Sequence, residues 1–474
     1  MLFNSFEFFF FLPAVFSLYW FVAGKSLKWQ NILILLSSYF FYGWWSIHFL
    51  SLLFLSTLLD YCYGFGVASA TRKKAKLFLW LSIVNNLGIL GLFKYYDFFT
   101  TELQIMLAGF GITVSTPLLN IAIPVGLSFY TFHGMSYVFD IYRNKQLPVK
   151  NFVDYAVFVS FFPLLVAGPI ERANHLLPQI QRTRIFKYSQ AVDGCKLILW
   201  GMFKKAVLAY TLSGIADTAF EEYETSSALC LITGAIAFSF QIYCDFSGYS
   251  DIAIGTAKIF GFEILSNFRF PYFSRDIAEF WRRWHISLTS WFKTYVYIPL
   301  GGSGEGTLKA IRNTFIIFLL SGFWHGPKWN FIAWGFIHAC AFLPLLLLKR
   351  NRKHIDTIAE NSPLPSFKEL MQMFVTFAFV TLAWIFFRAD NLSVAVDYIG
   401  HIATSLYSDP LQSLSKSVYK TLLCAIIIIV ADWQFRRNDR KLKIPTTISF
   451  LMGILIIYFM LYSDSDNNFI YFNF

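Results

Sequence analysis

The chain has 474 residues, of which 56% are hydrophobic and 14% are charged, and its mean hydropathy is +0.53. About a quarter of the residues in a typical soluble domain are charged, so this composition excludes an ordinary soluble protein. The formal net charge is +11, but the Lys and Arg residues lie in short loops between apolar blocks, which indicates cytoplasmic loops rather than nucleic-acid binding.

Apolar blocks that approach the length of a membrane span occur along the whole chain. They are residues 6–22, 32–45, 50–59, 231–240, 425–430 and 448–462. A helix of about 20 apolar residues crosses a bilayer and pairs its own backbone groups there. The first block has no basic stretch before it and no small-residue cleavage site after it, so we expect a spanning helix rather than a signal peptide. We predict an all-α polytopic membrane protein with roughly ten to twelve membrane helices.

The charged loops allow a topology. The basic segments are residues 25–28, 72–76, 143–150, 172–187, 349–354 and 436–443. If all of them are cytoplasmic, both termini lie outside, together with the acidic segments 221–224 and 463–466.

Two regions do not have the pattern of simple membrane spans. Residues 152–187 are apolar but begin and end on the basic side, and residues 246–312 are amphipathic and rich in Trp, Arg and Gly. Irregular backbone at membrane depth survives only where protein buries it or where it lines a cavity. We therefore expect re-entrant segments here and the functional site within residues 240–340. No internal repeat or soluble domain is evident, which predicts one transmembrane domain over residues 1–474, with an outer-side tail at 463–474.

The six Cys residues are scattered, mostly in apolar stretches, and neither Cys nor His shows metal-ligand spacing. They have the pattern of small buried apolar residues. We predict no metal site and no bound cofactor.

The first polar cluster is YCDFSGYSD at residues 243–251, which follows an apolar stretch. Two carboxylates, Asp245 and Asp251, are costly at membrane depth. They are candidates for substrate binding, and capping of a helix break explains them equally well.

The second cluster is EFWRRWH at residues 279–285. At helical spacing Trp281, Trp284 and His285 share one face, and Arg282 lies on another. An interfacial amphipathic helix explains the Trp and Arg residues but leaves His285 unexplained.

The third cluster is SGFWHG at residues 321–326, at the end of an apolar helix that we expect to begin near Phe315. An ionisable group within a membrane segment is by default a functional hypothesis. Imidazole suits a general base for a hydroxyl acceptor because it is mostly neutral at pH 7. His325 is therefore a catalytic candidate, although a buried structural histidine is the alternative.

These clusters resemble the membrane-bound O-acyltransferase family, in particular the alginate O-acetyltransferase membrane subunits and bacterial relatives that acetylate cell-wall polymers. The matching stretches are FWRRWHISL at 280–288, YIPLGG at 297–302, GFWHG at 322–326, PVGLSFYTF at 124–132, GPIER at 168–172 and QIYCDFSGYSD at 241–251. The resemblance covers nearly the whole chain.

The resemblance implies a ring of tilted helices with a central funnel in the bacterial inner membrane. The family's near-invariant His corresponds to His325 and its second polar position to His285. It also implies acyl transfer from a cytoplasmic thioester, acetyl-CoA, toward hydroxyls of an envelope polysaccharide or peptidoglycan. An extracytoplasmic SGNH-hydrolase-like partner would complete that transfer. Trp281, Arg282 and Trp324 join the two aspartates as substrate-binding candidates.

The last six residues, FIYFNF, resemble the C-terminal Phe-Ile-Tyr motif of the small protein that works with D-alanyl-transferring members of the family. This likeness suggests Tyr471 as an acyl relay on the outer side, since tyrosine can act as a covalent nucleophile. An aromatic belt at the membrane interface is the alternative.

Three other functions remain open. One is transfer of D-alanyl or another acyl group from a carrier protein. A second is transport or lipid flipping, although the paired half-sequences that transporters often show are absent. The third is a non-catalytic scaffold, against which the presence of both His motifs argues.

Overall fold

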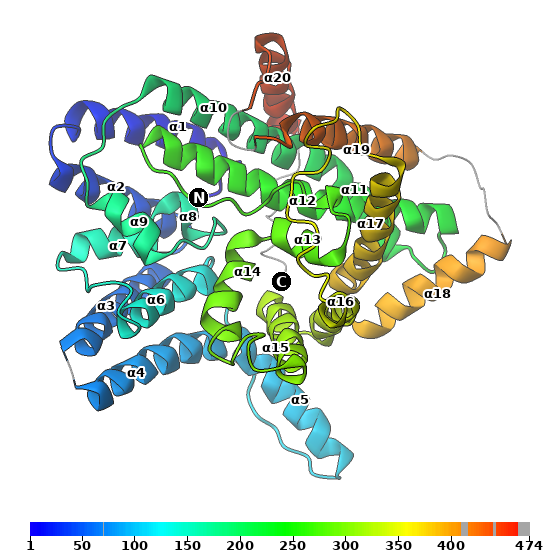
Figure 1. Cartoon of the computed structure of the whole chain (residues 1–474), viewed down its shortest axis with the longest axis horizontal. Helices are drawn as coiled ribbons and strands as arrows, with labels where there is room; N and C mark the ends of the chain where they lie inside the picture. Colours follow the sequence, from blue (N-terminus) through cyan, green and yellow to red (C-terminus); the bar gives the residue numbers. More distant parts are fainter. Residues whose placement is uncertain (70, 409–415, 439–441, 463–474) are drawn as a thin grey trace. The chain divides into compact units, whose positions relative to one another are not determined.

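The computed structural model describes residues 1–69, 71–408, 416–438 and 442–462, and every regular element in these ranges is a helix (Figure 1). The chain forms two compact units, residues 1–194 with 253–265 and residues 195–252 with 266–474. Two helices, α10 (Tyr188–Phe203) and α12 (Ala228–Ile259), contribute residues to both. The single membrane domain stays a prediction.

The first unit contains α1 (Phe6–Ser17), η1 (Leu18–Val22), α2 (Leu27–Gly43), α3 (Ile47–Ser69), α4 (Arg72–Leu90), η2 (Gly91–Tyr95), α5 (Tyr96–Gly109), α6 (Leu127–Tyr142), α7 (Phe152–Ser160), α8 (Phe162–Leu165) and α9 (Ala173–Ile180). The second contains η3 (Lys204–Ala209), α11 (Tyr210–Glu221), η4 (Pro271–Phe273), α13 (Ile277–Arg283), α14 (Ile286–Phe292), η5 (Lys293–Tyr297), α15 (Thr307–His325), α16 (Trp329–Leu347), α17 (Phe367–Arg388), α18 (Leu392–Ser408), α19 (Lys416–Phe435) and α20 (Thr446–Tyr462).

Six helical stretches of the described residues are long and apolar enough to cross a membrane. They are Ile47–Ser69, Arg72–Gly109, Ala228–Ile259, Trp329–Leu347, Phe367–Arg388 and Lys416–Phe435, and two shorter apolar stretches are Phe6–Val22 and Thr446–Tyr462. They confirm the prediction of an all-helical polytopic membrane protein, because helices satisfy their own backbone groups in lipid. Ten to twelve crossings stay a prediction.

The regions expected to be irregular consist largely of short helices. Residues 152–187 contain α7, α8 and α9, of nine, four and eight residues. At about 1.5 Å per residue none of them can cross a bilayer of about 30 Å. Residues 260–306 hold four more short helices, η4, α13, α14 and η5. Residues 246–259 differ from the expectation because they continue α12.

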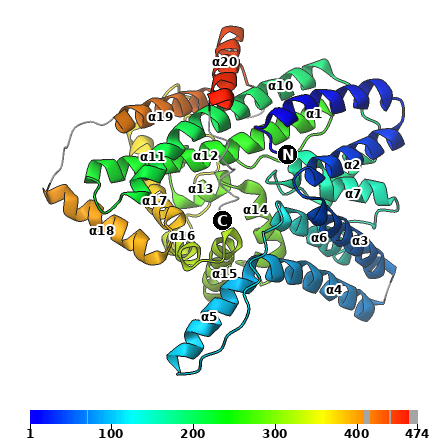
Figure 2. The ribbon, with the colours of Figure 1, turned by 180° about the vertical axis from the view of Figure 1, so that it is seen from behind.

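In the first unit, α3, α4 and α6 pack side by side around a buried carboxylate (Figures 1 and 2). Asp60 of α3 accepts hydrogen bonds from Ser82 at 2.6 Å and Asn86 at 3.0 Å, both on α4. A Cβ atom at Gly134 of α6 would lie 2.0 Å from Asp60 Oδ2. The absence of a side chain at Gly134 therefore allows the third helix to approach this polar centre.

Glu171 of the GPIER motif and Gln179 of α9 bind the backbone of residues 263–265. The Glu171 carboxylate is fully buried and accepts hydrogen bonds from the backbone N–H of Leu265 and, at 2.8 Å, from the His175 ring. Gln179 exchanges two hydrogen bonds of 2.8 Å with the backbone of Glu263. These contacts hold residues 263–265, directly before the segment that carries α13 and α14.

Candidate functional site

Two glycines bring the helices around His325 close together. His325 is the last residue of α15, which begins at Thr307, earlier than expected, and α16 packs back along it (Figure 1). A Cβ at Gly322 would lie 2.2 Å from the Phe331 carbonyl oxygen, and one at Gly335 would lie 2.3 Å from that of Phe318. Any larger residue at either position would push the two helices apart.

The imidazole of His325 is enclosed by aromatic rings and is 4% exposed. Its ring centroid lies 5.0 Å from Trp324, 5.3 Å from Trp334 and 5.1 Å from Phe387. The planes of His325 and Trp334 are perpendicular. Close packing of this kind keeps bulk water from the imidazole.

His285 has an unusual backbone conformation, and its ring has no hydrogen-bond partner among the described residues. It lies in the left-handed region, with φ 42° and ψ 53°, directly before α14. Both ring nitrogens are buried and unpaired among the described residues, and the residue is 1% exposed. A non-Gly residue held in a sparsely populated backbone region costs of order 1–3 kcal/mol and is found most often at functional sites.

Polar contacts hold this strained turn in place. Asn267 accepts a hydrogen bond from Ser287 of α14 at 2.5 Å and donates one to Ser250 of α12 at 3.2 Å. Its backbone carbonyl accepts from the N–H of Ile286 at 2.9 Å. The chain on the C-terminal side of His285 is therefore tied to α12.

The rings of both histidines contact Trp324. The Trp324 ring centroid is 5.8 Å from that of His285 and 5.0 Å from that of His325. The ring nitrogens of His285 have no hydrogen-bond partner in the part of the chain that the structure describes, so His285 does not hydrogen-bond to His325. Phe246 of α12 contacts the ring of His285 at a centroid distance of 4.7 Å.

The prediction that Trp281, Trp284 and His285 share one helix face is wrong. α13 ends at Arg283, Trp284 is extended, and the chain turns at His285. Trp281 instead points to α16, where its indole N–H donates to His338 Nδ1 at 3.3 Å.

The two aspartates of the YCDFSGYSD motif pair with lysines. Lys205 forms an ion pair with Asp245, and Lys204 forms one with Asp251 at 2.6 Å and donates to Ser247 at 2.8 Å. Both lysines belong to the π-helical segment η3, a geometry found frequently at functional sites. The motif lies inside the continuous helix α12, so the alternative that it caps a helix break is wrong.

A third carboxylate lies next to these ion pairs. The hydroxyl of Tyr243 donates to Asp432 of α19 at 2.7 Å, and the Lys204 ammonium lies 5.7 Å from the Tyr243 ring centroid. Our sequence reasoning missed Lys204, Lys205 and Asp432. Two adjacent lysines inside an apolar stretch were an available signal, because charged residues within membrane segments are rare and usually paired.

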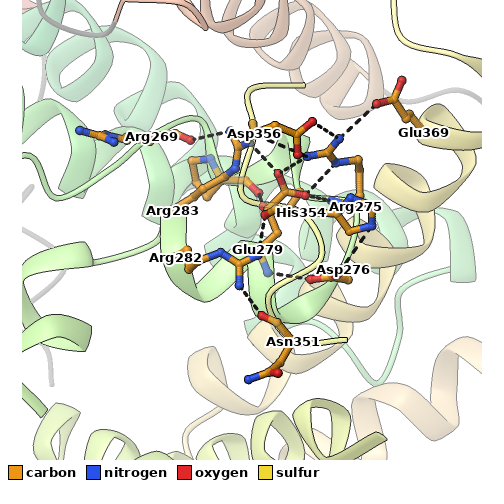
Figure 3. Close-up of polar contacts among 12 residues, drawn as sticks. Arg269, Arg275, Asp276, Glu279, Arg282, Arg283, Asn351, His354, Asp356 and Glu369 are labelled. Atoms are coloured by element: carbon orange, nitrogen blue, oxygen red, sulfur yellow. Dashed lines mark hydrogen bonds and ion pairs between the residues drawn. The ribbon is translucent and has the colours of Figure 1, made fainter. Parts of the chain in front are cut away.

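Arg282 is engaged by the loop that follows α16. Its guanidinium donates to the backbone carbonyls of Asn351 at 2.7 Å and His354 at 2.6 Å (Figure 3). A substrate-binding role for Arg282 stays a prediction, and any ligand would compete with or share these contacts.

A second arginine fastens the same loop. Arg275 binds Glu279 at 3.0 Å, Asp356 at 2.9 Å and Glu369 at 3.2 Å, and Arg283 binds Glu279 at 2.6 Å (Figure 3). The hydrogen bonds from Arg275 lower the pKa of Asp356 below its usual value. The network joins the start of α13, and so the segment that carries His285, to the chain between α16 and α17.

Tyr471 lies outside the described residues. Within the described ranges, no group of three or more His, Cys, Asp and Glu side chains is arranged to hold a metal ion.

The sequence of the chain is similar to a known family of membrane enzymes. The model of the membrane-bound O-acyltransferase family matches residues 34–385. The chain is 37% identical to the "Probable alginate O-acetylase AlgI" of Pseudomonas putida, over 90% of this chain and 85% of that protein. It is 31% identical to the "Peptidoglycan O-acetyltransferase" of Helicobacter pylori, over 100% and 98% of the two chains. It is 26% identical to the "Teichoic acid D-alanyltransferase" of Bacillus subtilis, over 56% and 68%. The chain therefore belongs to the membrane-bound O-acyltransferase family, in its alginate O-acetylase branch, and is an acyltransferase.

Proposed function

We propose that this protein is a membrane O-acetyltransferase that transfers acetyl groups from a cytoplasmic thioester, acetyl-CoA, toward hydroxyls of an extracellular polysaccharide or peptidoglycan. The names of the alginate and peptidoglycan relatives support the acetyl group and the glycan acceptor. Family membership as an acyltransferase argues against the transport and scaffold alternatives. The observation that carries the proposal is the pair of buried histidines, His285 and His325, whose rings both contact one tryptophan.

His325 is the proposed general base. It removes the proton from the attacking hydroxyl while the oxygen bonds to the thioester carbonyl carbon. When the carbon–sulfur bond breaks, the protonated imidazole returns that proton to the departing thiolate, which leaves as a thiol. The aromatic enclosure of His325 supports this role, because exclusion of water limits hydrolysis of the thioester.

His285 is the proposed hydrogen-bond donor to the carbonyl oxygen, on which negative charge develops. Its unpaired, buried ring nitrogens support this role over direct orientation of His325. A preorganised donor at a developing oxyanion is worth about 10²–10³ in kcat in enzymes where one has been removed. The strained backbone at His285 is also typical of functional sites.

The remaining assignments belong to the same proposal. Trp281 and Trp324 would line the substrate site, and Arg282 would attract the phosphates of the donor. Tyr471 would receive the acetyl group on the outer side and pass it to an extracytoplasmic SGNH-hydrolase-like partner. The basic loops support an inner-membrane protein with both termini outside.

Transfer of D-alanyl from a carrier protein is the second candidate function. The teichoic acid D-alanyltransferases among the relatives favour it, although they align over little more than half of this chain. A carrier-dependent enzyme would transfer nothing when acetyl-CoA is the sole donor.

The test is the amount of ester-linked acetate that mild base releases from envelope polysaccharides. Cells carrying the wild type, His325→Ala, His48→Ala or no protein are compared at equal membrane levels, and His48, an exposed residue of α3, is the control. We expect acetate at the no-protein level in His325→Ala and at the wild-type level in His48→Ala. Equal acetate in all four strains would overturn the proposal.

A further inference from the structure

A further buried histidine shares an aromatic neighbour with His325, because Trp334 contacts the rings of both. His338 of α16 is fully buried, and the rings of Phe280, Trp281, Phe318, Trp334 and Phe379 surround it at centroid distances of 4.9 to 6.4 Å. Its one hydrogen bond among the described residues is the one that Trp281 donates to Nδ1, at 3.3 Å. A neutral imidazole carries one proton, so acceptance at Nδ1 places that proton on Nε2.

This hydrogen bond joins elements that the backbone does not join. Trp281 belongs to α13, only seven residues long, whereas His338 and Trp334 belong to the long helix α16. The three rings meet pairwise, at 5.1 Å for Trp281 with His338, 4.9 Å for Trp334 with His338 and 5.6 Å for Trp281 with Trp334. Edge-to-face packing at such distances has a defined geometry, so each ring orients the other two.

The ring of Trp334 also contacts that of His325. Trp334 is fully buried, and its ring lies perpendicular to that of His325 at 5.3 Å. The position of the His325 imidazole therefore depends on Trp334, whose position depends on the pair formed by Trp281 and His338. A displacement of about 1 Å at a reacting group can lower a rate about 100-fold.

We propose that His338 is a positioning residue, which accepts the Trp281 hydrogen bond and thereby holds Trp334 against His325. The inference rests on the proposed function of His325. Two properties of His338 distinguish this role from packing alone. Packing depends on the volume of the ring, whereas the proposed role depends on the Nδ1 acceptor atom.

Three variants separate these properties. His338→Phe keeps a ring of similar volume and removes the acceptor. His338→Asn loses volume but keeps an acceptor near the Nδ1 position. Trp281→Phe removes the donor. Each is expressed in cells that also supply the proposed extracytoplasmic partner, and its membrane level and thermal stability are recorded. kcat and KM for acetyl-CoA are then measured in envelope preparations from these cells, with their own polysaccharide as the acceptor.

We expect His338→Phe to lower kcat about tenfold, equivalent to ~1.4 kcal/mol of activation free energy, with KM for acetyl-CoA changed less than about twofold. Such a split indicates an interaction that acts in the transition state. His338→Asn should recover at least half of the wild-type kcat. The double variant Trp281→Phe/His338→Phe should be no slower than the slower single variant, because both changes remove the same hydrogen bond.

Wild-type kcat in His338→Phe would overturn the inference, as would a His338→Asn protein as slow as His338→Phe. Multiplicative losses in the double variant would also overturn it. Failure of the proposed function has a different result, because His325→Ala would then keep full acetyl transfer or the wild type would transfer no acetyl group. If His338→Phe does not insert, His338→Asn and Trp281→Phe decide. A His338→Asn protein with at least half of the wild-type kcat, together with a Trp281→Phe protein whose kcat falls while its KM for acetyl-CoA is unchanged, supports the inference. Any other pattern opposes it.

Discussion

Replacement of Lys205 by Met should strongly destabilise the protein. The Lys205 and Asp245 side chains, which form an ion pair, are 5% and 10% exposed. Loss of one partner of a buried ion pair costs about 3–5 kcal/mol, because the other charge stays buried but loses its attraction to that partner. Replacement of both partners by apolar residues is often neutral, because the cost of burying both charges disappears together with their attraction.

The assay is the free energy of unfolding in mixed micelles for Lys205→Met, Asp245→Leu and the double variant. We expect a loss of about 3–5 kcal/mol in Lys205→Met and a loss within about 1 kcal/mol of wild type in the double variant. Since Asp245→Leu removes the other partner of the pair, its loss should also be about 3–5 kcal/mol. The coupling free energy, which is the double loss minus the two single losses, would then be at least about 5 kcal/mol in magnitude. Lys309→Met is the matched control because the Lys309–Glu305 ion pair is half-exposed, and such pairs contribute little.

Two results would refute this reasoning. One is a Lys205→Met protein as stable as Lys309→Met. The other is a double variant whose loss equals the sum of the two single losses, which would mean that the lysine and the aspartate act independently.

The remaining predictions concern the loop after α16, the contact between α15 and α16, and the C-terminal tail. Because Arg275 lowers the pKa of Asp356, wild type should be more stable than Asp356→Asn above pH ~4. This advantage should shrink as the pH falls below the unfolded-state pKa of Asp356, and it should disappear as the pH falls through the lower folded-state pKa. Thermal unfolding of both proteins is measured from pH 7 to pH 3, and a constant difference in stability over that range would contradict the account. Gly335→Ala should lower the free energy of unfolding by about 1–3 kcal/mol, because its methyl group overpacks against the Phe318 carbonyl. At Gly453 a Cβ would meet no atom of the described residues within 4 Å, so Gly453→Ala should not destabilise the protein. Equal unfolding free energies for the two variants would oppose this account. Tyr471→Phe should abolish acetate transfer to the envelope if Tyr471 is the relay, and full transfer by that variant would exclude it.

The sequence alone determined the class of protein and where the site should be sought. Long apolar blocks joined by short basic loops form a bundle of membrane helices in lipid, because each helix pairs its own backbone N–H and C=O groups. Motifs around His285 and His325 pointed to the family, which the comparisons confirmed. The roles of both histidines, of Tyr471 and of the substrate-binding candidates remain predictions.

The spacing of residues along the chain gave a wrong prediction where contacts with distant residues decide the structure. Helical spacing placed Trp284 and His285 on the same face as Trp281, but the chain leaves the helix after Arg283 because Asn267 fastens the next turn to α12. The same spacing gave no reason to expect a left-handed conformation at His285. Tertiary contacts compensate for that strain, and the periodicity of the sequence carries no information about those contacts.

The partners of the charged residues were likewise visible only in three dimensions. Asp245 meets Lys205 across 40 residues, and Arg282 meets the Asn351 carbonyl across 69 residues. A buried charge requires a partner, and the sequence shows that requirement without naming the partner. The partners are decided by the packing of α12 against η3 and of α13 against the loop after α16. Only tertiary packing brings residues so far apart in the chain within hydrogen-bonding distance.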